Sequence, residues 1–157
     1  MGRHKLPYKK GTWFLVPLRT KGYALGLVAR MDGKGRIFGY FFGPVISKAS
    51  VTVIPHDLRP QDAVLLGRFG DLGLIKGEWT VLGEKVDWNE EEWKIPPFIR
   101  VDEHSGKAFL SVYNENTLNF VSEKACAPAL VDKYPYDRDM GYGSVEIQLT
   151  KLLNLKR

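Results

Sequence analysis

The 157-residue sequence has a single cysteine, three histidines and no long apolar run. Because Cys126 is the only thiol, an intramolecular disulfide and a metal site built from several thiolates are both excluded. No apolar run reaches the about 18 residues that a membrane-spanning helix requires. The basic start of the chain is not followed by the apolar stretch of a signal peptide. We therefore predict a cytoplasmic protein that does not span a membrane.

Motifs that would reveal catalysis are also missing. The histidines His4, His56 and His104 show none of the spacings that hold zinc in hydrolases, such as H-x-H or H-E-x-x-H. The phosphate-binding motif G-x-x-x-x-G-K-[ST] and the serine nucleophile motif G-x-S-x-G do not occur. The apolar neighbours of Cys126 suppress its reactivity as a thiolate. These residues alone therefore predict no cofactor and no catalytic group.

Positive charge is concentrated near the N-terminus, although the whole chain carries a net charge of only +5. Residues 1–36 hold nine Lys and Arg against one Asp, a balance of +8, whereas the remaining 14 Lys and Arg face 17 Asp and Glu, a balance of −3. Domains that bind nucleic acid usually gather their basic residues on one surface. The acidic middle of this chain therefore argues against a nucleic-acid partner.

The composition, with 44% apolar and 12% aromatic residues, is typical of a globular chain. A chain of this length buries about 68–70% of its unfolded surface, so its core needs no disulfide or metal. We predict a basic N-terminal tail over residues 1–10 and a single domain over residues 11–157. The sequence leaves open whether the tail is ordered and whether the protein forms oligomers.

Short runs of β-branched and aromatic residues, separated by turn residues, predict two antiparallel meanders. The first meander has strands at 12–18, 23–31 and 36–42, and the second has strands at 98–102, 107–113 and 117–121. Between them we predict strands at 51–54, 63–69 and 78–82. The predicted fold is α+β and mainly antiparallel β, with the two meanders forming a curved sheet or partial barrel and a few short helices.

Three segments carry helix signals. Residues 88–94 follow Asp87, an N-cap, with Glu90 three residues later as in a capping box. Residues 128–134 predict a second short helix. Residues 144–155 fit both a strand and a helix, because their apolar residues satisfy both periods. The choice between helix and strand for this last segment stays open.

Large apolar residues on the predicted strands form the expected core. We predict burial of Trp13, Phe14, Val16, Leu25, Val28, Phe38, Leu65, Phe69, Phe109, Leu118 and Phe120. Two arginines, Arg30 and Arg68, lie among apolar strand residues. We expect them to be paired to a carboxylate such as Asp71.

The strongest binding-like pattern combines tryptophan with clustered negative charge between residues 87 and 94. Its candidate contact residues are Trp88, Glu90, Glu91, Glu92 and Trp93. Interface hot spots are rich in Trp, and surrounding charge steers the encounter. On a helix the two tryptophans would lie about 140° apart, so we expect one in the core and the other partly exposed. With a basic partner, this surface would meet the partner while the basic N-terminal end faces away.

Five glycine-containing blocks follow one another in order along the chain. They are GTWFLVPL at 11–18, GYALGLVAR at 22–30, GYFFGP at 39–44, RFGDLGL at 68–74 and MGYG at 140–143. Together the blocks resemble the bacterial immunity protein 26 family over roughly residues 11–150. Most of the matching residues are apolar or glycine, which indicates a shared fold.

Members of that family act as immunity proteins of polymorphic-toxin systems, each neutralising a partner toxin. The resemblance therefore implies a protein that binds its cognate toxin without turnover. The same family label is also attached to a small phosphotriesterase, so hydrolysis of organophosphate triesters is the alternative. In that alternative His56, Asp57 and Asp71 would supply the base or the ligands of a divalent metal.

Overall fold

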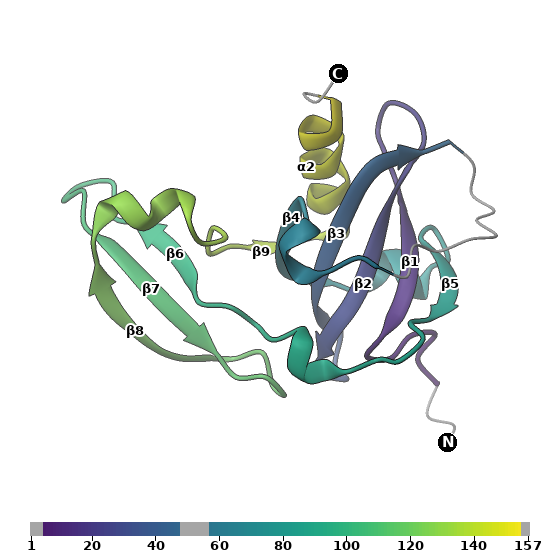
Figure 1. Ribbon diagram of the computed structural model, residues 1–157, viewed down its shortest axis with the longest axis horizontal. Helices are drawn as coiled ribbons and strands as arrows, with labels where there is room; N and C mark the ends of the chain where they lie inside the picture. The colour runs from purple at the N-terminus through teal and green to yellow at the C-terminus, as the bar shows by residue number, and fades with distance from the viewer. Residues whose placement is uncertain (1–4, 48–56, 155–157) are drawn as a thin grey trace.

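The computed structural model describes residues 5–47 and 57–154, and within these ranges the chain forms two β-sheets and two α-helices (Figure 1). The predicted strand at 51–54 and the candidate residue His56 lie outside the described residues. The α+β prediction is confirmed, since antiparallel strands dominate.

The larger sheet has six strands in the order β5-β1-β2-β3-β4-β9. Their bounds are β1 (Thr12–Pro17), β2 (Tyr23–Met31), β3 (Arg36–Ile46), β4 (Leu65–Gly70), β5 (Thr80–Glu84) and β9 (Asp139–Met140). Neighbouring strands are antiparallel, except that β4 and β9 form a short parallel pair. The first predicted meander is therefore confirmed as β1 to β3.

The smaller sheet is the second predicted meander, with strands in the order β6-β7-β8. Its strands are β6 (Phe98–Val101), β7 (Ala108–Tyr113) and β8 (Phe120–Cys126). We call this sheet the arm, because it extends away from the larger sheet in Figure 1. The two meanders thus lie in separate sheets, and neither sheet closes into a barrel.

Helical segments are short except at the C-terminal end. They are α1 (Leu72–Ile75), α2 (Tyr142–Asn154) and the 3₁₀ turns η1 (Pro60–Asp62), η2 (Glu90–Glu92) and η3 (Pro128–Asp132). The described part of the ambiguous segment, residues 144–154, is therefore helical, because Val145, Leu149 and Leu153 fall on one face of α2 and fill the core. No helix of the described ranges is long and apolar enough to cross a bilayer.

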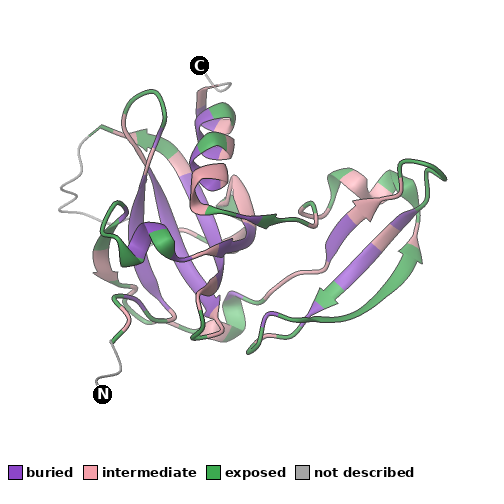
Figure 2. Ribbon diagram, turned by 180° about the vertical axis from the view of Figure 1, so that it is seen from behind, coloured by how far each residue is buried: buried purple, intermediate pink, exposed green. Residues whose placement is uncertain are grey.

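The central strands of the larger sheet are buried on both faces (Figure 2). On one face Phe14 stacks on Trp79 and belongs to the cluster that α2 covers. On the other face Trp13 and Phe42 belong to a cluster with Phe98 at the base of the arm. This two-sided burial explains why β1, β2 and β3 appear in the sequence as continuous apolar runs instead of alternating ones. We call the larger sheet together with α2 the body.

Most of the predicted core is confirmed. The buried members are Trp13, Phe14, Val16, Leu25, Val28, Phe38, Phe69 and Leu118. Leu65 and Phe109 are only half-buried. The prediction for Phe120 is wrong, since its side chain is 56% exposed. The chain turns at residues 114–118, where Leu118 has a φ of 61°, so β8 begins three residues later than predicted and places Phe120 on an outer strand.

A buried ionic joint attaches the arm to the body. The Arg68 guanidinium lies 2.6 Å from an Asp137 carboxylate oxygen and 3.7 Å from the centroid of the Tyr113 ring. The Tyr113 hydroxyl donates to the other oxygen of Asp137 at 2.7 Å. Arg68 is thus paired to a carboxylate as expected, but the partner is Asp137. Asp71 instead accepts a hydrogen bond from the Tyr8 hydroxyl at 2.7 Å.

The joint predicts a loss of stability at alkaline pH. Burial and the hydrogen bond to Asp137 raise the pKa of Tyr113 to about 12, from about 10 in an unfolded chain. The stabilisation is therefore fully present below pH 10 and is lost as the pH rises toward about 12. We expect the stability gap between wild type and Tyr113→Phe, measured by urea unfolding, to shrink over this interval. A gap that stays constant would contradict the prediction, and the exposed Tyr136→Phe is the control.

Candidate partner-binding surface

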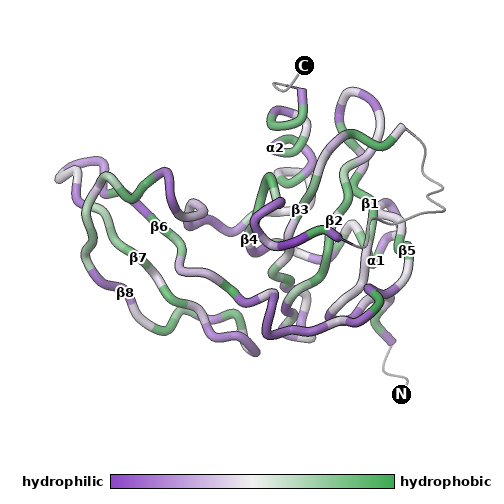
Figure 3. Tube along the Cα trace, in the orientation of Figure 1, coloured by the Kyte–Doolittle hydropathy of each residue, from purple (hydrophilic) through white to green (hydrophobic). Residues whose placement is uncertain are grey.

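The segment at residues 87–94, which we call the acidic turn, connects β5 to β6 and is a hydrophilic run in Figure 3. The predicted helix of one or two turns is instead the single 3₁₀ turn η2, and its N-cap is Asn89, not Asp87. The Asn89 side chain accepts from the Glu91 backbone N–H at 3.1 Å. Asp87 has a φ of 58°, which is incompatible with the extended backbone of an N-cap residue.

The two tryptophans of the acidic turn have different roles. Trp93 is buried, with its ring 5.0 Å from that of Tyr40. Trp88 is half-buried and stacks on Trp93 at 6.4 Å. It also lies over Gly11, where a Cβ atom would come within 2.9 Å of the indole. The expectation of one core and one partly exposed tryptophan is confirmed. The buried Trp93 packs beneath Trp88, so of the two tryptophans only Trp88 can contact a partner directly.

The carboxylates of the turn are partly engaged within the protein. Glu90 lies 2.9 Å from the Lys10 ammonium, and this contact lowers the pKa of the Glu90 carboxyl. Glu91 pairs with Lys94 at 3.2 Å, and Glu92 is exposed. Lys10, in the described part of the basic N-terminal segment, therefore lies alongside the acidic turn, contrary to the expectation that the basic end faces away. The neighbouring Lys9 pairs with Glu84 at the end of β5.

A buried guanidinium fixes the position of the turn. Arg30, on β2, donates to the backbone carbonyls of Glu90 and Trp93 at 2.8 and 3.0 Å. It also contacts the Glu115 carboxylate at 3.2 Å, and the backbone N–H of Ile95 donates to that same carboxylate. The sequence predicted a carboxylate partner for Arg30, but it did not predict the hydrogen bonds that Arg30 donates to the backbone of the acidic turn. The only available signal was a cation in an otherwise apolar strand.

The residues of the hydrolase alternative are spread along the chain. Asp71 is buried and bound by Tyr8, whereas Asp57 is exposed. The turn η1 and the strand β4 lie between Asp57 and Asp71 in the chain. A six-residue strand such as β4 is about 20 Å long. No hydrogen bond or ion pair among the described residues joins these two aspartates. Over the same residues, no group of three His, Cys, Asp or Glu could hold a metal ion.

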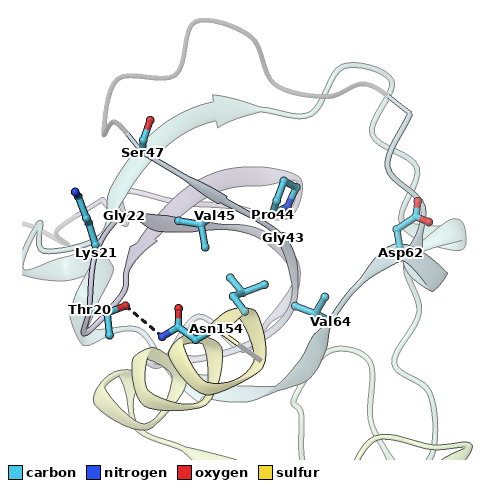
Figure 4. Close-up of a pocket in the computed structure, with 11 residues that line it drawn as sticks. Thr20, Lys21, Gly22, Gly43, Pro44, Val45, Ser47, Asp62, Val64 and Asn154 are labelled. Atoms are coloured by element: carbon cyan, nitrogen blue, oxygen red, sulfur yellow. Dashed lines mark hydrogen bonds between the residues drawn. The ribbon is translucent and has the colours of Figure 1, made fainter. Parts of the chain in front are cut away.

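A hollow of about 770 Å³ lies where the β1–β2 turn, the end of β3 and the end of α2 meet (Figure 4). Asn154 donates a hydrogen bond to Thr20 across one side of it. Its charged lining residues, Lys21 and Asp62, stand on opposite sides of the opening in Figure 4. Because the hollow brings no acid–base pair together, we place the candidate site at the acidic turn.

Comparison with known proteins identifies the family. The family model for immunity protein 26 matches residues 9–110 of this chain. The match includes β1 to β6 and the acidic turn, and it ends within β7. No curated protein and no solved structure matches the chain significantly. Because the match covers more than half of its length, the chain belongs to the immunity protein 26 family, and this membership implies an immunity protein with a toxin as its partner.

Proposed function

We propose that this protein neutralises a cognate bacterial toxin by binding to it, without turnover. The observation that carries the proposal is the family match over residues 9–110. An inhibitor of this kind needs a rigid surface that is complementary to its target and needs no reacting groups. The acidic turn supplies such a surface, because its backbone is held by a buried side chain and its outward groups are already in place.

The toxin contact is assigned to Trp88 and to the exposed carboxylates of Asp87, Glu91 and Glu92. Trp88 is backed by the buried Trp93, so little side-chain freedom is lost when a partner covers it. The three carboxylates project from a turn that Arg30 holds in place. Such charges raise the rate of encounter with a basic patch on the partner.

The decisive experiment looks for a toxin domain encoded directly upstream of the gene for this protein and, if one is found there, pairs the two chains. Expression of the toxin domain alone is expected to stop growth of the host, and co-expression of this protein is expected to restore it. The two chains should also copurify in a 1:1 complex. Growth that stays arrested, together with no binding between the purified chains, would contradict the proposal.

We expect the double variant Glu91→Gln, Glu92→Gln to associate with that toxin domain several-fold more slowly. Exposed charges act at a distance, and salt shortens this distance from about 10 Å at 0.1 M to about 3 Å at 1 M. The difference from wild type should therefore disappear in 1 M salt. The melting temperature should stay the same, because both side chains are exposed. Glu90 is left unchanged because it holds Lys10.

A matched control removes two negative charges elsewhere. Glu78→Gln with Glu103→Gln changes the net charge by the same amount, and both side chains are exposed. Stopped-flow measurements should show a near-normal association rate for this control. An equal slowing in both double variants would mean that only the net charge matters and that the acidic turn is not the contact.

A further inference from the structure

Among the described residues β8 pairs with β7 alone, so the arm ends in a strand that has a free edge. β8 spans seven residues and, apart from the half-buried Cys126, all of them are exposed. The opposite edge of the arm is covered, because Ile99 on β6 donates to Pro135 at 2.9 Å and accepts from Asp137 at 2.8 Å. The edge strands of the body are β9, which has two residues, and β5, whose pairing with β1 contains a bulge. β8 also has a bulge, at Val121, but its pairing with β7 is regular from Ser122 to Cys126.

The register of the arm shows which backbone groups of β8 point outward. Asp102 and Lys107 are bonded to each other across the β6–β7 turn, with Asp102 donating at 2.8 Å. Because hydrogen-bonded pairs alternate along antiparallel strands, Ala108, Leu110 and Val112 point their backbone groups toward β8. Their partners there are Cys126, Lys124 and Ser122.

The intervening residues of β8 therefore present free backbone groups on its outer side. These residues are Glu123 and Ala125, whereas Val121 lies in the bulge where the pairing of β8 with β7 shifts by one residue. Unpaired N–H and C=O groups in such a row are a template for a further strand.

The side chains along this edge indicate what kind of strand fits. Apolar side chains lie at its start, where Phe120 and Val121 are 56% and 57% exposed. Glu123 is engaged by Arg100 at 2.7 Å. Lys124 is exposed and forms no ion pair within the described residues. Lys124 also lies between two outward-bonding residues, a position at which side chains on paired antiparallel strands approach most closely.

We infer that β8 receives an extended segment of the toxin as an additional antiparallel strand, with an acidic side chain opposite Lys124 and apolar side chains near Phe120 and Val121. This inference rests on the proposed function and adds a second contact to it. Edge strands commonly recognise extended peptides in this way, with affinity from the main chain and specificity from alternate side chains.

A second copy of this chain fits the edge less well. If the β8 strands of two copies paired with each other over the regular stretch from Ser122 to Cys126, the two-fold axis would pass through Lys124. Two Lys124 side chains would then stand directly opposite each other, and like charges in that position are destabilising. The same lysine favours a foreign strand that carries a carboxylate.

The edge is also continuous with the acidic turn. The loop at residues 114–119 precedes β8, and Glu115 in this loop contacts the same Arg30 that holds the turn. In Figures 1 and 2 the loop and η2 lie along the same lower side of the molecule. One partner can therefore cover both.

The test uses two variants of β8 against the upstream-encoded toxin domain. Ala125→Pro removes one outward N–H but no bond to β7, and proline is tolerated where the N–H of an edge strand faces solvent. Lys124→Glu reverses the charge opposite the expected carboxylate. Lys107→Glu, at an exposed position in the turn between β6 and β7, is the matched control. We expect the first two variants to raise the Kd at least tenfold and the control to leave it within twofold.

Hydrogen exchange locates the contact independently. The backbone amides of Glu123 and Ala125 are expected to exchange at least tenfold more slowly in the complex than in the free protein. If the toxin domain binds wild type but both β8 variants bind equally well, the inference is overturned and the proposed function stands. If the toxin domain does not bind wild type, both fail. A dimer of the free protein that Ala125→Pro abolishes would assign the edge to a second copy and overturn the inference. If Ala125→Pro does not fold, Lys124→Glu decides.

Discussion

Replacement of Arg30 by methionine is expected to lower the free energy of unfolding by about 3 kcal/mol and to release the acidic turn. The Arg30 guanidinium is buried, and it satisfies backbone carbonyls of Ala29, Glu90 and Trp93. Methionine fills much of the volume but donates no hydrogen bond. The three carbonyls would then have to find water, and they can do so only if the turn moves away from β2.

Two measurements separate loss of stability from release of the turn. Urea unfolding gives the free energy, and near-ultraviolet circular dichroism reports on the stacked pair of Trp88 and Trp93. Arg138→Met is the control, because Arg138 is exposed and contacts only the ring of Tyr136 among the described residues. A stability loss under about 1 kcal/mol with an unchanged dichroism spectrum would show that the turn holds itself in place.

Gly26→Ala is expected to destabilise the protein by about 3 kcal/mol, because a well-packed core resists added volume. Gly26 is paired with Phe14 on β1 and with Phe41 on β3. A Cβ atom at this position would overlap the ring of Phe14. That ring cannot retreat, since it is stacked on Trp79 and lies edge-on to Phe41.

Gly70→Ala is the matched control for Gly26→Ala. Gly70 ends β4, and a Cβ atom there would meet nothing within 4 Å. Alanine restricts the unfolded chain, so this variant should be more stable than wild type by about 0.4–1 kcal/mol. Thermal melts should show opposite shifts, at about 2–4 °C for each kcal/mol. A lower melting temperature for both variants would mean that the overlap at Gly26 is not the cause.

The strands of the first meander were predictable from sequence because their local signals agree with the fold. β2 has the predicted bounds, since a run of apolar residues ends at the Asp32–Gly35 turn. The separation of the two meanders was not predictable. It depends on Arg68, Phe98 and Asp137, residues far apart in the sequence that meet at the joint.

For the candidate site, composition indicated a segment but not the place of each of its residues in the structure. Clustered acid and tryptophan singled out residues 87–94. The sequence could not show that Trp93 faces Tyr40 while Trp88 faces outward, because the backbone at Asp87 does not continue a helix. The free edge of β8 was hidden for a different reason. The alternation of apolar and polar residues within one strand does not show on which side that strand lacks a neighbouring strand.

The parallel strand β9 and helix α2 return to the body only after the chain has completed the acidic turn and the arm. On the ribosome these residues, 139–154, are made after the residues of the acidic turn and the arm. Until they arrive, the sheet face that holds Val28 and Phe41 has no cover from Val145 and Leu149. A nascent chain that stops at residue 138 would carry every proposed toxin contact on an unfinished body. Under the proposed function, each molecule therefore presents its toxin contacts on a finished body only after α2 has been translated and docked.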